Sequence, residues 1–174
     1  MRIIRKKVLI FVLCLIFAVT LVTAFFIYKN NEIKSLKYIT TVEKWCKEYN
    51  VDVYIALATI EVESGGDENA VSNVGAIGLM QLMPKTADWI AKECGVETND
   101  YFAVDTNIRL GVAYLSYLSK KFDGDMVFCA YNAGEGVVKK WIEDGGEIKY
   151  KETREYVEKI KNMIKRIKNK VYLY

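Results

Sequence analysis

Histidine is absent from this chain of 174 residues, and proline occurs once. A Ser-His-Asp triad, a Cys-His pair and a histidine-ligated zinc site each need an imidazole, so the sequence excludes these three kinds of site. With 52% hydrophobic and 27% charged residues, the composition also argues against a disordered or proline-rich chain. The length predicts one folded domain with short appendages.

A strong excess of one charge is also missing, since 25 Lys and Arg stand against 22 Asp and Glu, for a formal net charge of +3. The basic residues gather at the two ends of the chain. So small a net charge does not indicate a polyanionic partner. We therefore expect no nucleic-acid binding.

Cysteine is scarce, and three of the four cysteines lie outside the apolar run at the start of the chain. These are Cys46, Cys94 and Cys129, an odd number that cannot pair completely within one chain. Cys46 and Cys94 could form a disulfide, although their spacing does not require one. The sequence has no CxxC pattern, and we expect neither a metal nor a cofactor.

The longest uncharged run covers residues 8–28, which is long enough to cross a bilayer as a helix. Four basic side chains precede it within residues 1–7, and three lysines follow it. This asymmetry predicts a cytoplasmic basic tail over 1–7, a transmembrane anchor over 8–28 and an extracytoplasmic remainder. A cleaved signal peptide is the alternative, but the apolar run continues through Ile27, beyond the small residue Ala24.

Apolar residues at helical spacing dominate the rest of the chain, and no long stretch alternates with a period of two. We therefore expect an all-α fold, with the main domain over 49–160 and the basic end of its last helix over 161–174. The first expected elements are a juxtamembrane helix over 29–48 and a nearly all-apolar helix that Asp52 caps. A helix that begins at Pro84 and ends at Gly95 follows, and then a helix that Asp105 caps. The last two elements are an apolar run over 126–133 and a basic amphipathic helix that begins at Thr153.

A carboxylate ends the apolar face of the helix that follows Asp52. On a helical period, Glu63 falls on the same stripe as Ala56 and Ile60. Desolvation there should raise the pKa of the carboxyl toward neutrality, as a general acid requires. Glu61 lies about 200° round the helix, and we expect it to be solvated. The alternative for Glu63 is an ordinary helix-end position pointing to water.

A glycine-jointed loop is expected beside Glu63, between residues 64 and 83. Its apolar residues are too many to be left in water, so we expect them to be packed and the loop to form the wall of a cleft. These residues are Val71, Val74, Ile77, Leu79, Met80, Leu82 and Met83.

Four short motifs follow one another over residues 49–160, namely Glu63-Ser64, residues 78–81 (GLMQ), residues 130–134 (AYNAG) and residues 152–157 (ETREYV). Together they resemble the motifs of the soluble-lytic-transglycosylase (SLT) family. The resemblance implies a lysozyme-like, mainly helical domain that cleaves the β-1,4 bond between N-acetylmuramic acid and N-acetylglucosamine in peptidoglycan. The expected location is the outer side of the bacterial cytoplasmic membrane; protein partners stay open, an envelope-spanning assembly among them.

By position, the resemblance implies that Glu63 is the catalytic acid and base. It would protonate the glycosidic oxygen and then take a proton from the muramic acid 6-hydroxyl, which closes a 1,6-anhydro ring without water. Substrate-assisted glycosidases need no second carboxylate, although Asp67 and Glu68 keep a two-carboxylate mechanism open. The implied substrate-binding residues are Ser72, Gln81, Met83, Tyr131, Asn132 and Tyr156.

Other functions stay open on the same residues. A hydrolase like the goose-type lysozymes shares the fold and the glutamate but delivers water to the anomeric carbon. An inactive peptidoglycan-binding module would keep the fold without cleavage. A membrane-surface protein acting through its basic last helix is the weakest alternative, because charge runs are usually solvated faces.

Overall fold

The computed structural model describes residues 12–23, 25, 32–98 and 100–171. The chain divides into two compact units, Met1–Glu32 and Ile33–Tyr174. In the first unit, residues 12–23 and 25 are helical and their large apolar side chains are exposed. Within the described ranges, no helix combines the length and the apolar character needed to cross a bilayer. The predicted tail over 1–7 and parts of the predicted span (8–11, 24 and 26–28) lie outside the described residues.

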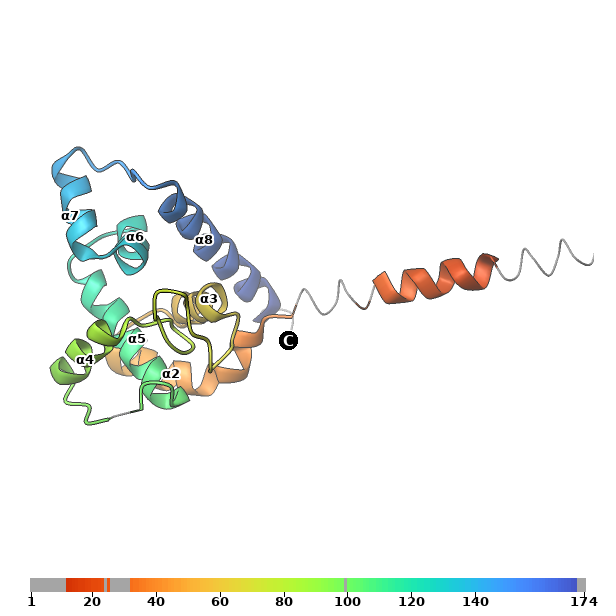
Figure 1. The fold of residues 1–174 in the computed structure, drawn as a ribbon, viewed down its shortest axis with the longest axis horizontal. Helices are drawn as coiled ribbons and strands as arrows, with labels where there is room; N and C mark the ends of the chain where they lie inside the picture. The colour runs from red at the N-terminus through yellow and green to blue at the C-terminus, as the bar shows by residue number, and fades with distance from the viewer. Residues whose placement is uncertain (1–11, 24, 26–31, 99, 172–174) are drawn as a thin grey trace, which may run out of the picture. The chain divides into compact units, whose positions relative to one another are not determined.

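The second unit is built from helices joined by loops, which confirms the predicted all-α fold (Figure 1). In the described part of the chain the only β-type pairings are two isolated bridges, Val71 with Ile77 and Ile77 with Leu82. The elements are the 3-10 helix η1 (Lys34–Tyr38) and the α-helices α2 (Ile39–Tyr49), α3 (Val53–Ser64), α4 (Pro84–Glu93), α5 (Val104–Ser119), α6 (Asp125–Ala133), α7 (Glu135–Glu143) and α8 (Lys151–Val171).

The helix α3 forms as the sequence predicts. The Asp52 carboxylate caps it by accepting a hydrogen bond from the backbone N–H of Tyr54 at 2.7 Å. Residues 56–60 are buried, because α8, α2 and η1 all pack against this helix. Gly65 ends it in the left-handed conformation, with φ of 60°. Glu63 therefore lies in the last turn of a helix that is held on several sides.

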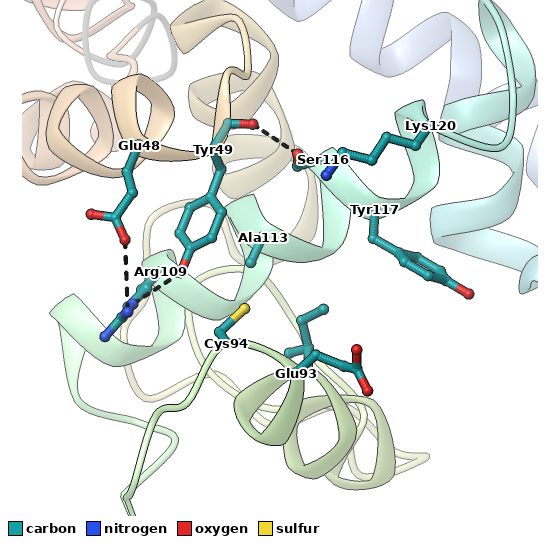
Figure 2. A pocket seen from close by; sticks show the side chains of 10 residues that line it. Glu48, Tyr49, Glu93, Cys94, Arg109, Ala113, Ser116, Tyr117 and Lys120 are labelled. Carbon is teal, nitrogen blue, oxygen red and sulfur yellow. Dashed lines mark hydrogen bonds and ion pairs between the residues drawn. The ribbon is translucent and has the colours of Figure 1, made fainter.

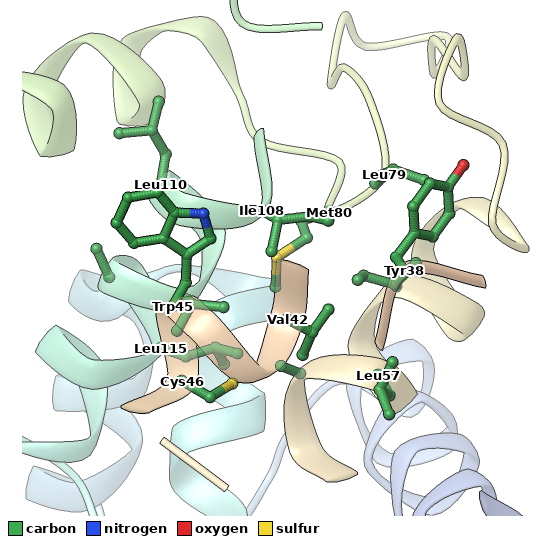
Figure 3. Close-up of a cluster of buried hydrophobic side chains, with 14 of the residues drawn as sticks. Tyr38, Val42, Trp45, Cys46, Leu57, Leu79, Met80, Ile108, Leu110 and Leu115 are labelled. Atoms are coloured by element: carbon green, nitrogen blue, oxygen red, sulfur yellow. The ribbon is translucent and has the colours of Figure 1, made fainter. Parts of the chain in front are cut away.

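The segment predicted as a juxtamembrane helix, 29–48, is part of the core from Ile33 on, and its residues 29–31 lie outside the described residues. Val42, Trp45 and Cys46 of α2 are buried, and α2 packs against α5 and α3. Figure 3 shows Val42 and Trp45 among side chains from α3, α5 and the loop that follows α3, Met80 included. The compact unit accordingly starts at Ile33, while the functional boundary at residue 49 stays a prediction.

The start of α5 differs from the prediction that Asp105 caps it. Asp105 lies inside the first turn, and its carboxylate accepts a hydrogen bond from Trp45 Nε1 at 3.0 Å. Asp100 accepts instead from two backbone N–H groups at 2.9 and 3.1 Å, just before the helix begins at Val104. Pairing with the α2 indole therefore outweighs capping for Asp105.

The other helix boundaries are close to those predicted. Pro84 occupies the first turn of α4, and Gly95 follows that helix in the left-handed region with φ of 63°. The last helix, α8, begins at Lys151, two residues before the predicted Thr153. Its buried side packs on α3 and α6, so α8 forms one wall beside the end of α3.

Candidate functional site

Glu63 and Tyr156 meet where α3 packs on α8. The hydroxyl of Tyr156 donates a hydrogen bond to Glu63 Oε1 at 2.7 Å. Tyr156 is buried, and the carboxyl of Glu63 is half-buried. The alternative in which Glu63 merely points to water is therefore wrong.

Burial raises the pKa of Glu63 to about 7, while the hydrogen bond from Tyr156 lowers this pKa and so limits the rise. Burial, and next the charge of Glu63, raise the pKa of the Tyr156 hydroxyl well above its ordinary value. Tyr156 therefore keeps its proton, and it can stabilise the ionised form of Glu63. Both forms of the carboxyl are populated near neutral pH, which suits a group that first gives and then takes a proton.

Tyr131, at the end of α6, is the second tyrosine beside Glu63. Its hydroxyl donates to the carbonyl oxygen of Met80 at 2.8 Å. Burial raises the pKa of Tyr131 well above its ordinary value, and the charge of Glu63 raises it further. Its ring centroid is 5.4 Å from that of Tyr114 on α5. Tyr131 thus joins the end of α6 to the loop after α3 and to α5.

Asn107 of α5 fastens that loop to the core, and sequence reasoning missed it. Its fully buried amide accepts from the N–H of Met80 at 2.8 Å and donates to the carbonyls of Ile77 at 3.2 Å and Tyr101 at 2.8 Å. A Cβ on Gly78 would lie 2.4 Å from Asn107 Nδ2, so glycine is required there. The sequence signal that could have identified Asn107 was a polar amide side chain on the apolar face of a predicted helix.

Gln81 and Met83 line a cavity of about 240 Å³, the Gln81 hollow. Gln81 has a left-handed backbone with φ of 45°, and its amide nitrogen donates to the carbonyls of Gly78 at 2.9 Å and Ala70 at 3.1 Å. The Gln81 side chain therefore shapes the loop as well as the hollow. The other lining residues are Leu82, Thr86, Tyr114, Tyr131, Asn132, Ala133 and Gly134.

Of the predicted substrate-binding residues Asn132 and Ser72, only Asn132 lines the Gln81 hollow. Asn132 lines the Gln81 hollow, and its Oδ1 accepts from Thr153 Oγ1 at 2.8 Å, which ties α6 to α8. Ser72 does not line this hollow; its Oγ accepts from the N–H of Ala76 at 2.9 Å inside the loop. The structure thus brings Gln81, Met83, Tyr131 and Asn132 around one hollow, and gives Ser72 a bond that organises the loop.

The packing expected for the loop is only partly correct. Leu79, Met80 and Leu82 are buried, but the side chains of Val71 and Val74 are 61% and 76% exposed. The prediction that all of the apolar loop residues would be packed was therefore wrong. The loop is fastened at its Gly78–Leu82 end and projects its valines outward.

The other carboxylates near Glu63 in sequence have their own partners. Glu61 was expected to be solvated, but its Oε2 accepts from the backbone N–H of Ser35 at 2.7 Å at the start of η1. Glu68 accepts from the Tyr38 hydroxyl at 3.1 Å and lies 3.9 Å from Lys37 Nζ. Among the described residues, no hydrogen bond joins Asp67 or Glu68 to Glu63. The two-carboxylate mechanism stays an alternative, because it needs carboxyl groups on opposite sides of the scissile bond and no hydrogen bond between them.

A larger cavity of about 380 Å³, the Arg109 hollow, lies between α2, α4 and α5 and holds none of the predicted site residues (Figure 2). There Arg109 Nε donates to the Tyr49 hydroxyl at 3.1 Å, and the guanidinium lies 3.7 Å from Glu48. Cys94 also lines this hollow as a free thiol, and Cys46 and Cys129 are free as well. Cys46 and Cys94 are thus not joined.

Comparison with known proteins identifies the family. The sequence profile described as "Transglycosylase SLT domain" matches residues 40–154. The soluble lytic murein transglycosylase of Salmonella typhimurium is 31% identical over 143 residues, which cover 72% of this chain and 22% of that protein. The membrane-bound lytic murein transglycosylase C of Glaesserella parasuis is 33% identical over 134 residues, covering 69% of this chain and 37% of that protein.

Solved structures agree with the sequence comparison. An inactive Glu-to-Gln mutant of the lytic transglycosylase Slt from Pseudomonas aeruginosa superimposes with a TM-score of 0.67 at 33% identity, over 72% of this chain and 23% of that one. The 70-kDa soluble lytic transglycosylase in complex with bulgecin A gives a TM-score of 0.73 at 27% identity, over 78% of this chain and 25% of that one. The chain spans between about a fifth and two fifths of the length of these relatives. With its fold and most of its length matched, it belongs to the transglycosylase SLT domain family.

Proposed function

We propose that this chain is a peptidoglycan lytic transglycosylase that cleaves the bond between N-acetylmuramic acid and N-acetylglucosamine and leaves a 1,6-anhydro sugar. The observation that carries the proposal is the carboxyl of Glu63, whose pKa is raised to about 7 by burial beside Tyr156. The names of the relatives, which are lytic murein transglycosylases, support the same reaction.

In the first step the protonated Glu63 gives its proton to the glycosidic oxygen as the bond to the anomeric carbon breaks. The positive charge that develops on the muramyl sugar is stabilised by the N-acetyl group of the substrate itself, as in other substrate-assisted glycosidases. Glu63 becomes a carboxylate, and the hydrogen bond from Tyr156 at 2.7 Å stabilises that charge.

In the second step the carboxylate of Glu63 takes a proton from the 6-hydroxyl of the same muramyl sugar. The hydroxyl oxygen attacks the anomeric carbon, so a new carbon–oxygen bond closes the anhydro ring. Glu63 ends protonated, as it began, and no water is consumed. A pKa near 7 suits both steps, because neither proton transfer is then steeply uphill.

We assign the sugar chain to the Gln81 hollow and its surroundings. Met83, which is 43% exposed, offers an apolar contact for a sugar face. Asn132 and Gln81 offer amides, and Tyr131 places its hydroxyl between the loop and Glu63. Ser72 contributes by holding the loop and keeps an O–H free to donate to a sugar.

We further propose that residues 8–28 anchor the protein in the bacterial cytoplasmic membrane as a single pass, with the helical unit on the outer side. The length of the apolar run and the basic residues before it support this topology. The name of the Glaesserella parasuis relative, a membrane-bound enzyme, agrees with membrane association. Peptidoglycan lies on that side of the membrane.

The decisive experiment is mass spectrometry of the fragments that the full-length chain, kept in a nonionic detergent, releases from purified peptidoglycan. We expect anhydro-muropeptides from the parent and a loss of at least about 1,000-fold in the Glu63→Gln variant, because general acid-base catalysis supplies a factor of this order. Glu61→Gln is the matched control on the same helix and should keep full activity.

The rival functions give other products. Reducing-end fragments would assign the chain to hydrolysis, as in the goose-type lysozymes. Binding of peptidoglycan without any release, by the parent and by Glu63→Gln alike, would favour the inactive binding module. Unchanged turnover in Glu63→Gln would rule out the role proposed for this glutamate.

A further inference from the structure

A third cavity lies along the seam between α3 and α8, on the side of α3 that carries Val62. It has a volume of about 330 Å³ and is here called the Lys159 hollow. Its lining combines apolar side chains with two cations and one amide: Val62, Lys159, Asn162, Met163 and Arg166. No carboxylate contributes to it, which distinguishes it from the Arg109 hollow.

The residues that line the Lys159 hollow are near neighbours in sequence of the proposed catalytic pair, Glu63 and Tyr156. Val62 directly precedes Glu63 in α3. On α8, Lys159 lies one helical turn after Tyr156, on the same stripe of the helix, and Tyr156 holds Glu63 Oε1. The hollow and the proposed catalytic pair are therefore formed by the same two helices, α3 and α8.

Among the described residues, neither cation of the Lys159 hollow has an acidic partner. In the described ranges no ion pair involves Lys159 or Arg166, whereas the neighbouring Lys161 lies 3.2 Å from Asp125 and 3.7 Å from Glu158. From Lys159 to Val171 the helix contains no Asp or Glu. Lys159 and Arg166 thus carry positive charge that no ion pair of the described residues neutralises.

We propose that the Lys159 hollow binds a carboxylate of the peptide stem carried by the muramyl sugar. This inference rests on the proposed function, since it names a further part of the same substrate. In peptidoglycan the stem is attached to the sugar whose anomeric carbon reacts, and it bears free carboxylates. Lys159 and Arg166 complement those charges, while Val62 and Met163 offer contacts to the alkyl side chains of the stem.

The test compares two forms of one substrate, namely glycan strands with their stems and the same strands stripped by an amidase. The full-length chain in nonionic detergent is assayed beside the double variant Lys159→Gln/Arg166→Gln. We expect kcat/KM for stem-bearing strands to fall about fivefold to tenfold, the effect of losing two charge-assisted contacts at a partly exposed site. For stripped strands it should change less than about twofold.

The matched control is Lys165→Gln/Lys47→Gln, which removes the same net charge from two exposed lysines outside the hollow. It should leave the preference for stem-bearing strands unchanged. The inference would be overturned if the Lys159→Gln/Arg166→Gln variant lost kcat/KM equally on stem-bearing and stripped strands. It would also be overturned if the control variant lost as much kcat/KM on stem-bearing strands as the Lys159→Gln/Arg166→Gln variant. A variant that loses binding to phosphatidylglycerol vesicles while keeping the stem preference would assign the hollow to lipid instead.

A binding measurement separates this inference from the proposed reaction. Calorimetry measures the affinity of a soluble disaccharide tetrapeptide for Glu63→Gln with and without the two further substitutions. We expect affinity about fivefold weaker without the cations. If the parent chain proves inactive, this readout still decides the inference: a weaker affinity supports it and an unchanged affinity overturns it.

Discussion

The Arg109 hollow and the Glu63 site differ in whether their charged group has a partner of opposite charge within the described part of the fold. The Arg109 hollow, at about 380 Å³, is larger than the Gln81 hollow at about 240 Å³. Its guanidinium, however, is already held by Tyr49 and Glu48. Glu63 is a half-buried carboxyl that accepts a hydrogen bond from a neutral phenol, and burial raises its pKa. A group whose charge is not compensated within the fold marks a working site better than space does.

The helix α5 contributes residues both to the loop beside the Glu63 site and to the Arg109 hollow. Asn107 of α5 faces the loop that carries Met80 and Gln81, and Arg109, two residues later, faces the other hollow. Substitutions on α5 therefore test whether the two sides differ in function or only in shape.

The largest effect on stability is expected from Asn107→Ala. It removes the partner of the buried Met80 N–H and of two carbonyls, which should lower the free energy of unfolding by about 3 kcal/mol. Thermal denaturation measures this, and Asn169→Ala, at an exposed position of α8, is the control. A loss below about 1 kcal/mol would mean that the amide does not fasten the loop.

The next effect is a pH-dependent gain of stability in Glu63→Gln. In the parent the pKa of Glu63 is about 7 when folded, above the ordinary 4.5, so the folded state binds more protons and loses stability as pH rises through that interval. The glutamine variant should be more stable than the parent by about 2 kcal/mol at pH 8, and the gain should vanish below pH 4.5. Denaturant titrations at the two pH values measure it. A gain that is equal at both, or a similar gain in the exposed Glu143→Gln control, would contradict the burial of this carboxyl.

A smaller effect is expected from Tyr156→Phe. The hydrogen bond from Tyr156 lowers the pKa of Glu63, so its removal should raise that pKa above 7 and move the alkaline fall of the pH–rate profile to higher pH. We expect kcat to drop about tenfold, because the carboxylate formed in the first step loses its donor. Tyr150→Phe, which alters an exposed tyrosine, should leave the profile in place.

The smallest effect is expected from Arg109→Gln. Since Arg109 interacts with Tyr49 and Glu48 rather than with the Gln81 hollow, kcat/KM on peptidoglycan should change less than about twofold. The same assay on the parent and on Tyr156→Phe provides the values of kcat/KM with which the Arg109→Gln variant is compared. A tenfold loss would show that the larger hollow takes part in the reaction and would remove the distinction between the two.

The part of the site that lies on α3 was predictable, because it depends on local periodicity. An apolar helix capped by Asp52 and ending in a carboxylate placed Glu63 correctly and suggested the raised pKa. The partners of Glu63 come from distant segments, and the motif resemblance rather than periodicity pointed to Tyr156 and Tyr131. Their hydrogen bonds could not be derived from spacing.

The loop shows where sequence reasoning reached its limit. Its glycines predicted breaks in the helical pattern, but Gly78 is also needed for the close approach of Asn107. Gly111 of α5 is needed for the close approach of the loop residue Met80, since a Cβ on Gly111 would lie 2.3 Å from Met80 Sδ. Apolar composition predicted burial for the whole loop, yet Val71 and Val74 are exposed. The close packing at Gly78 and the exposure of the two valines depend on the end of the loop to which Asn107 is hydrogen-bonded. Asn107 is distant from the loop in sequence, so local patterns could not predict this contact.

The lack of histidine gives the raised pKa of Glu63 a practical consequence. Imidazoles ordinarily dominate the side-chain titration of a protein between pH 6 and 8, and this chain has none. Infrared difference spectra recorded across neutral pH should therefore contain the carbonyl band of this carboxylic acid with little overlap from other side chains. The protein thus contains its own spectroscopic reporter, which can follow the proposed acid through substrate binding without any added label.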